Sequence, residues 1–159
     1  MENKLITREI NYKTIYPTIN IFTNVIFDHF IELSKLDYIK HTKQDIYVLL
    51  SSEQLFGYLV KLNGKIIAYL VGETTTTPDG RNVYFLSYIY VIKQYQHIKI
   101  GSMLVKKLIS HCQDLGIPFI VLICDLHDKK VTNFYKKFGF VIDPILKNNK
   151  QHDALCLYL

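Results

Sequence analysis

Residues 83–116, VYFLSYIYVIKQYQHIKIGSMLVKKLISHCQDLG, contain the change of pattern that decides the fold. The first ten residues are a run of mostly apolar and aromatic side chains, which is typical of a buried strand. From Ile100 onward, apolar residues recur every three or four positions, as on one face of a helix, and Gly116 supplies a stop signal. The pattern therefore predicts a strand at residues 83–92, a short polar loop, and a helix at residues 101–115.

Two apolar segments precede this strand, at residues 55–62 and 65–72. Asn63-Gly64 separates them, and this pair is a strong hairpin signal because both residues tolerate positive φ. Pro78-Asp79-Gly80 predicts a second reversal before residue 83. We therefore expect three antiparallel strands in a meander.

The sequence pattern of the N-terminal third predicts a strand followed by two helices. The strand is expected at residues 5–10. Apolar residues between Ile15 and Leu33 follow at helical spacing, and Pro17 suits the first turn of that helix. Thr42, with Asp45 three residues on, resembles a capping box and predicts a second helix through Leu50.

The last third of the chain alternates in the same way. Its patterns predict a strand at residues 119–124 and a helix at residues 129–138 that ends before Gly139. Two further strands are expected at residues 140–142 and 154–159, joined by a polar segment at residues 147–152. The whole order predicts an α+β fold in one domain, residues 1–159. We expect a mixed, mostly antiparallel sheet of about seven strands with about four helices and one central parallel crossover.

Composition narrows the class of protein. The 159 residues are 49% hydrophobic and 21% charged, which suits a single compact domain. No stretch approaches the roughly 18 consecutive apolar residues of a membrane span, and no signal peptide is visible, so a cytoplasmic location is expected. Cys112, Cys124 and Cys156 are widely spaced, show no metal-ligand pattern, and are expected to be reduced core residues. No bound metal is expected.

The formal charge of +5 indicates some preference for anionic partners. The lysines are scattered among acids rather than gathered in a block. Twelve tyrosines and nine phenylalanines would allow base stacking, but most fall in strand or helix patterns and are expected to line the core. Nucleic acid is therefore not an expected partner.

The start of the helix at residue 101 is a candidate anion site. A helix N-terminus presents unpaired N–H groups and the positive end of the helix dipole. Gly101 allows close approach to the backbone, while Lys99 and His97 add positive charge or hydrogen-bond donors. An ordinary strand-to-helix connection is the alternative interpretation.

Two segments resemble motifs of the GCN5-related N-acetyltransferases. Residues 95–102, YQHIKIGS, are similar to the coenzyme-binding motif Gln/Arg-x-x-Gly-x-Gly/Ala, with Gln96 at the first position, Gly101 at the last, and Lys99 in place of the middle glycine. Residues 134–140, FYKKFGF, are similar to the signature Phe-Tyr-x-Lys-x-Gly-Phe. The family usually has Asn and Ala where this chain has Asp128 and Val131. The resemblance covers about residues 54–142.

The resemblance implies an enzyme that uses acetyl-CoA as its cosubstrate. In this family two central parallel strands splay apart and hold the pantetheine arm. The implied coenzyme-binding residues are Ile89, Tyr90, Val91, Gln96, His97, Ile98, Lys99, Ile100, Gly101, Ser102, Asp128 and Tyr135. Tyr135 is the implied acid that protonates the departing thiolate. A tyrosine that only closes a helix against the sheet is the alternative.

The general base has no clear candidate in the sequence. Relatives often place a carboxylate on the strand before the coenzyme loop, and here Ser87 and Tyr88 stand at the corresponding positions. Glu73 is a possible substitute at the end of the preceding strand, or simply a solvated strand end. We expect His111 to lie away from the cleft, and His29 and His41 to be surface or helix-packing residues.

The expected acceptor is a primary amine of a small molecule, such as an amino acid, a polyamine or an amine drug. An amine of a protein or of a charged tRNA is an alternative that the net positive charge of the chain permits. A non-catalytic acyl-CoA-binding module is a third reading, because the strand lacks a carboxylate. A monomer or a homodimer is expected.

Overall fold

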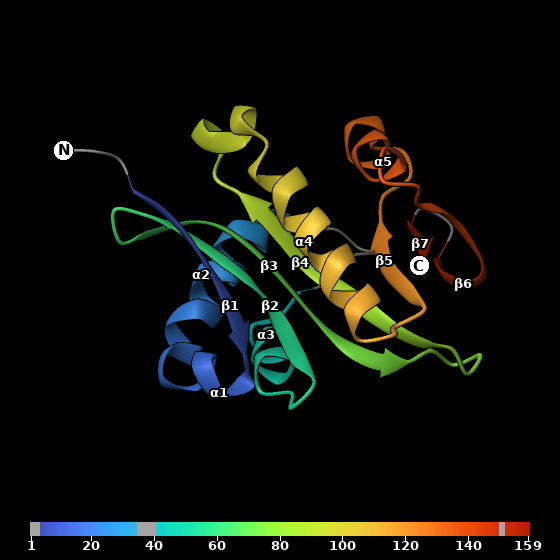
Figure 1. The fold of residues 1–159 in the computed structure, drawn as a ribbon, viewed down its shortest axis with the longest axis horizontal. Coiled ribbons are helices and arrows are strands. Elements are labelled where there is room, and N and C mark those ends of the chain that lie inside the picture. The colour runs from blue at the N-terminus through green and yellow to red at the C-terminus, as the bar shows by residue number, and fades with distance from the viewer. Residues whose placement is uncertain (1–3, 35–40, 150–151) are drawn as a thin grey trace.

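The computed structural model describes residues 4–34, 41–149 and 152–159 (Figure 1). Its strands are β1 Leu5–Asn11, β2 Leu55–Leu62, β3 Lys65–Thr76, β4 Asn82–Val91, β5 Phe119–Cys124, β6 Val141–Asn149 and β7 His152–Tyr158. Its helices are α1 Tyr12–Ile15, η1 Tyr16–Thr18, α2 Ile19–Ser34, α3 Lys43–Leu50, η2 Lys93–Ile98, α4 Ile100–Asp114 and α5 Lys129–Lys136, where η marks a 3₁₀ helix.

All seven strands form one mixed sheet in the order β1-β2-β3-β4-β5-β7-β6. Only β4 and β5 are parallel neighbours; the other pairs are antiparallel. The predicted hairpin between β2 and β3 is confirmed, with Asn63 at φ 51° and Gly64 at φ 82°. The predicted α+β class and the single parallel crossover are therefore confirmed.

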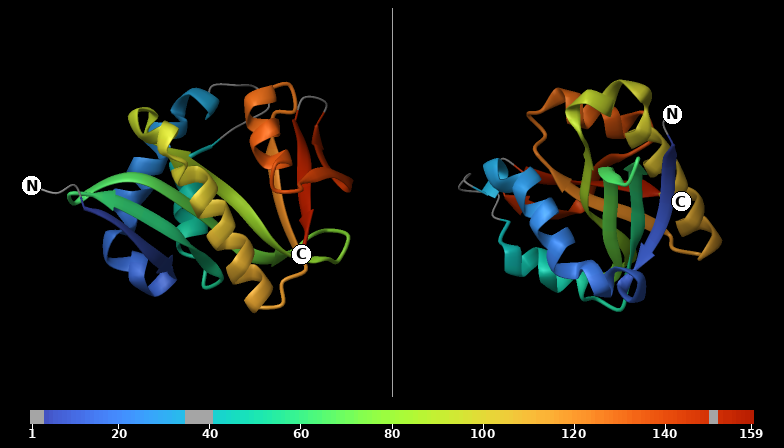
Figure 2. Two further views of the ribbon diagram at one scale, coloured as in Figure 1. Left: turned by 45° about the horizontal axis from the view of Figure 1, so that its top comes forward. Right: turned by 90° about the vertical axis from the view of Figure 1, so that its left-hand side faces the viewer.

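Helices cover both faces of the sheet (Figure 2). One face packs against α1–α3, and its core includes Phe22, Ile26 and Leu50. The other face packs against α4 and α5, and its core includes Leu104 and Leu108. Successive strand residues point to opposite faces, so β3 contributes to both cores.

The sheet opens between its two parallel strands. Pairing of β4 with β5 covers only residues 83–86 against 119–122, although β4 continues to Val91. At the same level, the register of β3 with β4 shifts, with Val71 opposite Tyr88 and Gly72 opposite Leu86. Ser87 is therefore the extra residue of a β-bulge, which bends the strand and increases its twist. The expected splay begins at this bulge.

Some sequence expectations are corrected by the structure. The first predicted helix is three pieces, α1, η1 and α2, with Pro17 inside the 3₁₀ turn. The described residues contain five α-helices, close to the expected number of about four. The helix expected at residues 129–138 ends at Lys136. The segment at 147–152, expected to be a loop, is mostly strand, because β6 extends to Asn149 and β7 begins at His152.

A buried ion pair joins the β3–β4 turn to β6. Asp143 is 1% exposed, and the Arg81 guanidinium donates to both of its carboxylate oxygens at 2.8 and 3.1 Å. The backbone N–H groups of Ile145 and Leu146 also donate to Asp143, each at 2.9 Å. Arg81 is bound on its other side by Asp79, with Nε to Oδ2 at 2.6 Å. This network fixes the far end of the splayed half of the sheet.

Cys112 and Cys156 are free thiols, as expected. Cys112 and Cys156 are buried, and Cys124 is half-buried at the end of β5.

Candidate active site

The N-terminus of α4 is open. Lys99 stands at its N-cap position with no hydrogen bond from a capping side chain, and the first helical bond there runs from the Met103 N–H to the Lys99 carbonyl at 3.1 Å. Within the described chain, nothing accepts a hydrogen bond from the N–H groups of Ile100, Gly101 and Ser102. Three free N–H groups at the positive end of a 15-residue helix suit an anionic group such as a phosphate.

Lys99 has a left-handed backbone conformation, with φ 61° and ψ 29°. This conformation costs a non-glycine residue roughly 1–2 kcal/mol, which explains why the family motif has glycine there. The Lys99 side chain lies on the outer face of α4, where Ser102, Lys106 and Lys107 also line a depression of about 510 Å³. Lysine in place of the motif glycine at position 99 therefore adds charge to this face of α4 but strains the backbone.

Gln96 braces the predicted coenzyme loop, residues 95–102. Its side-chain Nε2 donates to the Val91 carbonyl at 2.9 Å, which ties the loop back to the end of β4. The neighbouring residues His97 and Ile98 are exposed in η2. The loop thus has a defined shape set by Gln96, and its surface is accessible.

The last residues of β4 have a free edge toward β5. Ile89, Tyr90 and Val91 pair with β3 on one side, and no described strand pairs with them on the other. Their side chains alternate: Ile89 and Val91 pack toward α4, and Tyr90 packs toward α2. Backbone groups on that edge are available to pair with the amides of a ligand in the gap.

Tyr135 lies across the gap on α5. It is 6% exposed, and its ring contacts those of Phe134 and Phe140 at centroid distances of 5.1 and 5.4 Å. Burial, and secondarily the nearby Cys124 thiol, raises the pKa of Tyr135 well above its usual range. Tyr135 is therefore a neutral phenol near neutral pH.

Asp128 and Glu73, two further predicted site residues, lie on different elements of the structure. Asp128 is the N-cap of α5, and its Oδ1 accepts from the Val131 N–H at 3.2 Å. Glu73 is half-buried and lies opposite Phe85 in the β3–β4 register. Its position is two residues along β3 from Val71, on the same face of the sheet. Roles of Asp128 toward the coenzyme and of Glu73 as a base stay predictions.

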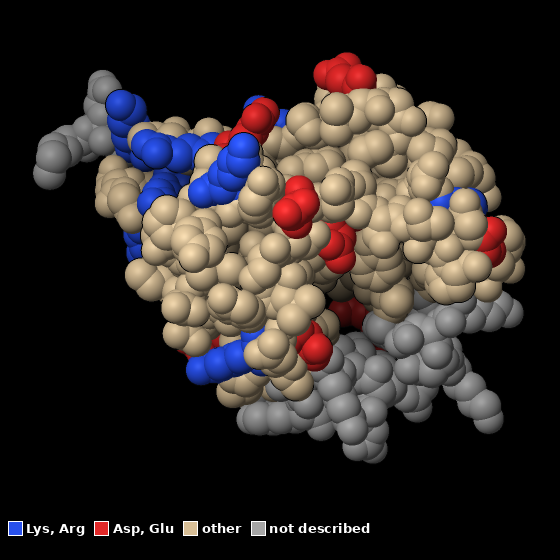
Figure 3. Space-filling view, turned by 90° about the horizontal axis from the view of Figure 1, so that it is seen from below, with Lys and Arg blue, Asp and Glu red and all other residues tan. Residues whose placement is uncertain are grey.

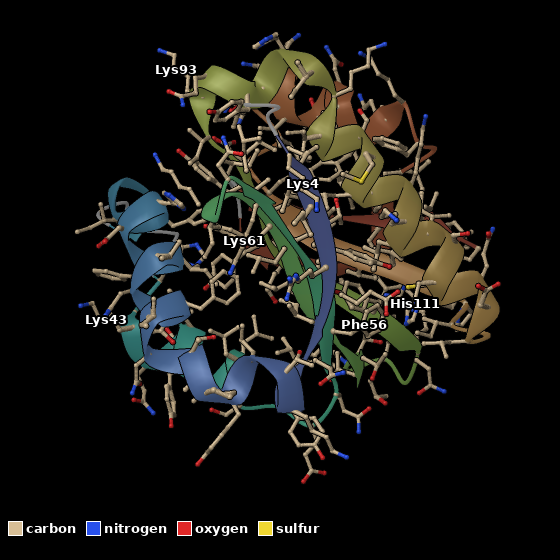
Figure 4. All side chains as sticks on the ribbon, turned by 60° about the vertical axis from the view of Figure 1, so that its left-hand side comes forward. Lys4, Lys43, Phe56, Lys61, Lys93 and His111 are labelled. Atoms are coloured by element: carbon tan, nitrogen blue, oxygen red, sulfur yellow. The ribbon has the colours of Figure 1, made fainter. Side chains whose placement is uncertain are left out.

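The histidines divide between the two faces of the sheet. His111 packs on Phe56 with ring centroids 4.6 Å apart, and Figure 4 shows these two side chains facing each other under α4. His29 and His41, on the opposite face, do more than pack: the Nδ1 of His29 lies 2.9 Å from the Tyr69 hydroxyl, and the Nδ1 of His41 lies 2.9 Å from the Tyr88 hydroxyl. Sequence reasoning missed these two pairs.

Figure 3 shows several acidic side chains near the middle of the face seen from below. The described residues contain no group of His, Cys, Asp and Glu side chains that could hold a metal ion. In the same residues, no helix has the length and apolar character needed to cross a membrane.

The fold is that of solved acetyltransferases. A GNAT-family acetyltransferase from Streptococcus pneumoniae aligns with a TM-score of 0.65 at 20% identity, covering 98% of this chain and 100% of its own. The PaiA N-acetyltransferase of Thermoplasma acidophilum, in complex with coenzyme A, gives a TM-score of 0.68 at 14% identity, with coverages of 98% and 99%. An aminoglycoside acetyltransferase from an uncultured soil metagenomic sample gives 0.67 at 13% identity, with coverages of 92% and 95%.

The sequence itself matches a family model. Residues 23–140 match the acetyltransferase (GNAT) family, whereas no curated protein sequence matches the chain. The protein therefore belongs to the GNAT acetyltransferase family and is an acyltransferase. The family resemblance inferred from the two sequence motifs is confirmed.

Proposed function

We propose that this protein transfers an acetyl group from acetyl-CoA to a primary amine of a small molecule, by direct attack of the amine on the thioester. The observation that carries the proposal is the continuity of the open β4 edge with the uncapped N-terminus of α4, opposite the buried phenol of Tyr135. The free N–H groups fit a pyrophosphate, and the free strand edge fits the amides of a pantetheine arm.

Each residue has a distinct task in the proposed reaction. Acetyl-CoA supplies a thioester carbonyl that is open to attack by a neutral amine. The N–H groups of Ile100, Gly101 and Ser102 hold the diphosphate, and the β4 edge holds the arm in line with the gap. As the C–N bond forms and the C–S bond breaks, Tyr135 donates its proton to the departing thiolate, a step that a phenol shielded from water performs well. The nitrogen loses one proton as it becomes an amide, and this proton restores the Tyr135 phenol.

A small amine is favoured over an amine on a nucleic acid. The lysines are scattered among acids rather than gathered in the dense block that a polyanion such as tRNA would require, and acidic side chains lie near the middle of one face (Figure 3). The acceptor types that we propose are an amino acid, a polyamine or an amine drug. We also propose a cytoplasmic enzyme that is a monomer or a homodimer and needs no metal.

The first test combines calorimetry with acetyl-CoA and a thiol-release screen over amines. Tyr135→Phe is expected to lower turnover by about 10²–10⁴-fold, the usual contribution of a positioned acid, with little change in acetyl-CoA affinity. Tyr58→Phe is the matched control, because Tyr58 is another buried tyrosine on the same face and its hydroxyl bonds to the Lys107 carbonyl at 3.1 Å. Unchanged turnover in Tyr135→Phe would remove its acid role. Binding of acetyl-CoA without turnover of any amine would favour a non-catalytic module.

A further inference from the structure

A hydrogen-bonded pair of Tyr88 and His41 lies beside the open part of β4. The Tyr88 hydroxyl and the His41 Nδ1 are 2.9 Å apart, and their ring centroids are 5.3 Å apart. The ring of Phe30 contacts both, at centroid distances of 5.2 Å from Tyr88 and 6.1 Å from His41. The pair is thus held in place by a third ring from α2.

Tyr88 occupies the first ordinary strand position after the bulge. The pairing of β4 with β5 ends at Leu86, so Tyr88 lies in the part of β4 that is separated from β5 by the gap. Its side chain belongs to the core on the α1–α3 face, whereas Tyr135 belongs to the core on the α4–α5 face. The two phenols therefore approach the gap from opposite faces of the sheet. A thioester in the gap would have Tyr135 on one side and an acceptor near Tyr88 on the other.

Tyr88 by itself is a poor base. Burial, with a smaller contribution from the Asp45 carboxylate, raises the pKa of Tyr88 to about 12, so its phenolate is scarce at neutral pH. A phenol can still move a proton if it gives up its own at the same time. His41 is the group placed to take that proton, because an imidazole nitrogen can accept one near neutral pH. The Asp45 carboxylate, at the start of α3, favours positive charge in this region.

We propose that Tyr88 is a catalytic residue that takes a proton from the acceptor ammonium group while passing its own hydroxyl proton to His41. One N–H bond of the acceptor breaks as an O–H bond forms on Tyr88, and the former Tyr88 proton forms an N–H bond at His41 Nδ1. The acceptor leaves this step as a neutral amine, and His41 gains the positive charge. His41 acts through Tyr88 and is a positioning residue. This inference rests on the proposed function and supplies the base that the sequence lacks.

The second histidine–tyrosine pair offers an internal control. His29 and Tyr69 make the same Nδ1 to hydroxyl contact, at the same 2.9 Å, but Tyr69 is fully buried. His29 is also stacked on Tyr90 with ring centroids 4.1 Å apart. Burial lowers the pKa of His29, against a weaker opposing effect of Asp28. The pair has the same chemistry as Tyr88 and His41, but Tyr69 is more deeply buried than Tyr88, at 0% against 7% exposed, so its expected role is packing.

The test compares two acceptors that differ in their charge. An alkyl amine is an ammonium ion at neutral pH and must lose a proton to a base before it can attack, whereas an aryl amine is already neutral and needs no deprotonation before attack. Tyr88→Phe is expected to lower kcat on the alkyl amine by about 10²–10⁴-fold and to leave kcat on the aryl amine nearly unchanged. His41→Asn keeps an acceptor for the Tyr88 hydroxyl but cannot take its proton, so the same selective loss is expected. Tyr69→Phe is expected to change neither rate.

The outcomes separate this inference from the function on which it rests. Equal loss on both amines, or loss on neither, in Tyr88→Phe and His41→Asn would overturn the relay while leaving the acetyltransferase intact. If the wild-type protein turns over no amine, the proposed function fails and the relay fails with it. Acetyl-CoA affinity by calorimetry and thermal melting identify a variant that has simply lost its fold, and His41→Asn, at a partly exposed site, is the safer of the two.

Discussion

Replacement of Asp143 by Asn should remove much of the stability of the domain. Asp143 is 1% exposed and accepts four hydrogen bonds, two from Arg81 and two from backbone N–H groups. Asn can keep the two backbone bonds through its remaining oxygen, but its NH₂ group would face the guanidinium. The Arg81 bond to Oδ2 is therefore lost, and the Arg81 bond to Oδ1 no longer has a charged acceptor. Hydrogen bonds to charged groups contribute about 1.5–3 kcal/mol each. We expect a loss of about 3–5 kcal/mol, the usual cost of breaking a buried pair.

This loss is large compared with the roughly 5–15 kcal/mol that stabilises a typical domain. The measurement is urea unfolding followed by far-ultraviolet circular dichroism, because the chain has no tryptophan. Asp79→Asn is the matched control: it removes the other carboxylate bound to Arg81, but that carboxylate is partly exposed, with 20% of its side-chain surface accessible. A much smaller effect is expected there. If the two variants unfolded at the same urea concentration, the reasoning from burial would be refuted.

Two further predictions concern pH and the coenzyme loop. Burial alone would raise the pKa of Asp143, but the Arg81 and backbone hydrogen bonds lower it overall. The unfolded chain therefore binds this proton at higher pH than the folded one, so the ion pair stabilises the fold above the ordinary aspartate pKa of about 3.9 and that contribution is lost as pH falls through the lower folded pKa. Acid titration of the melting temperature should be flatter in Asp143→Asn than in the wild-type protein, and parallel curves would contradict this. Lys99→Gly should stabilise the protein by up to about 1 kcal/mol, because glycine relieves the left-handed backbone strain at a small entropic cost. Lys99→Ala, which removes the charge but keeps the strain, should give no such gain in a thermal melt; an equal gain would mean that charge, and not φ, is responsible.

Local signals determined most of the elements. The capping box of α3 is present with both of its bonds, Asp45 N–H to Thr42 Oγ1 at 3.0 Å and Thr42 N–H to Asp45 Oδ2 at 3.3 Å. β5 has the predicted bounds, Phe119–Cys124. Caps, turns and short apolar runs are readable because the residues that interact are within a few positions of each other.

Local signals were weaker at the ends of long patterns. The apolar stripe from Ile15 to Leu33 did not reveal that the helix is broken at η1. The polar residues at 147–149 gave no strand pattern, yet β6 extends through them because β7 offers a pairing edge. Backbone pairing with a neighbour can extend a strand regardless of side-chain polarity, and that neighbour is invisible to a local pattern.

The sequence by itself determined the family, and it predicted the coenzyme loop and Tyr135 as the candidate acid, because each depends on a short motif at a strand–helix or helix–strand junction. Only the tertiary structure decided which polar groups meet. His41 and Tyr88 are 47 positions apart, and Arg81 and Asp143 are 62 apart. Such pairs depend on sheet order, register and the bulge at Ser87, none of which has a local signature. The missing carboxylate on β4 was visible in the sequence, but the histidine that faces Tyr88 became visible only when α2 and α3 were packed against the sheet.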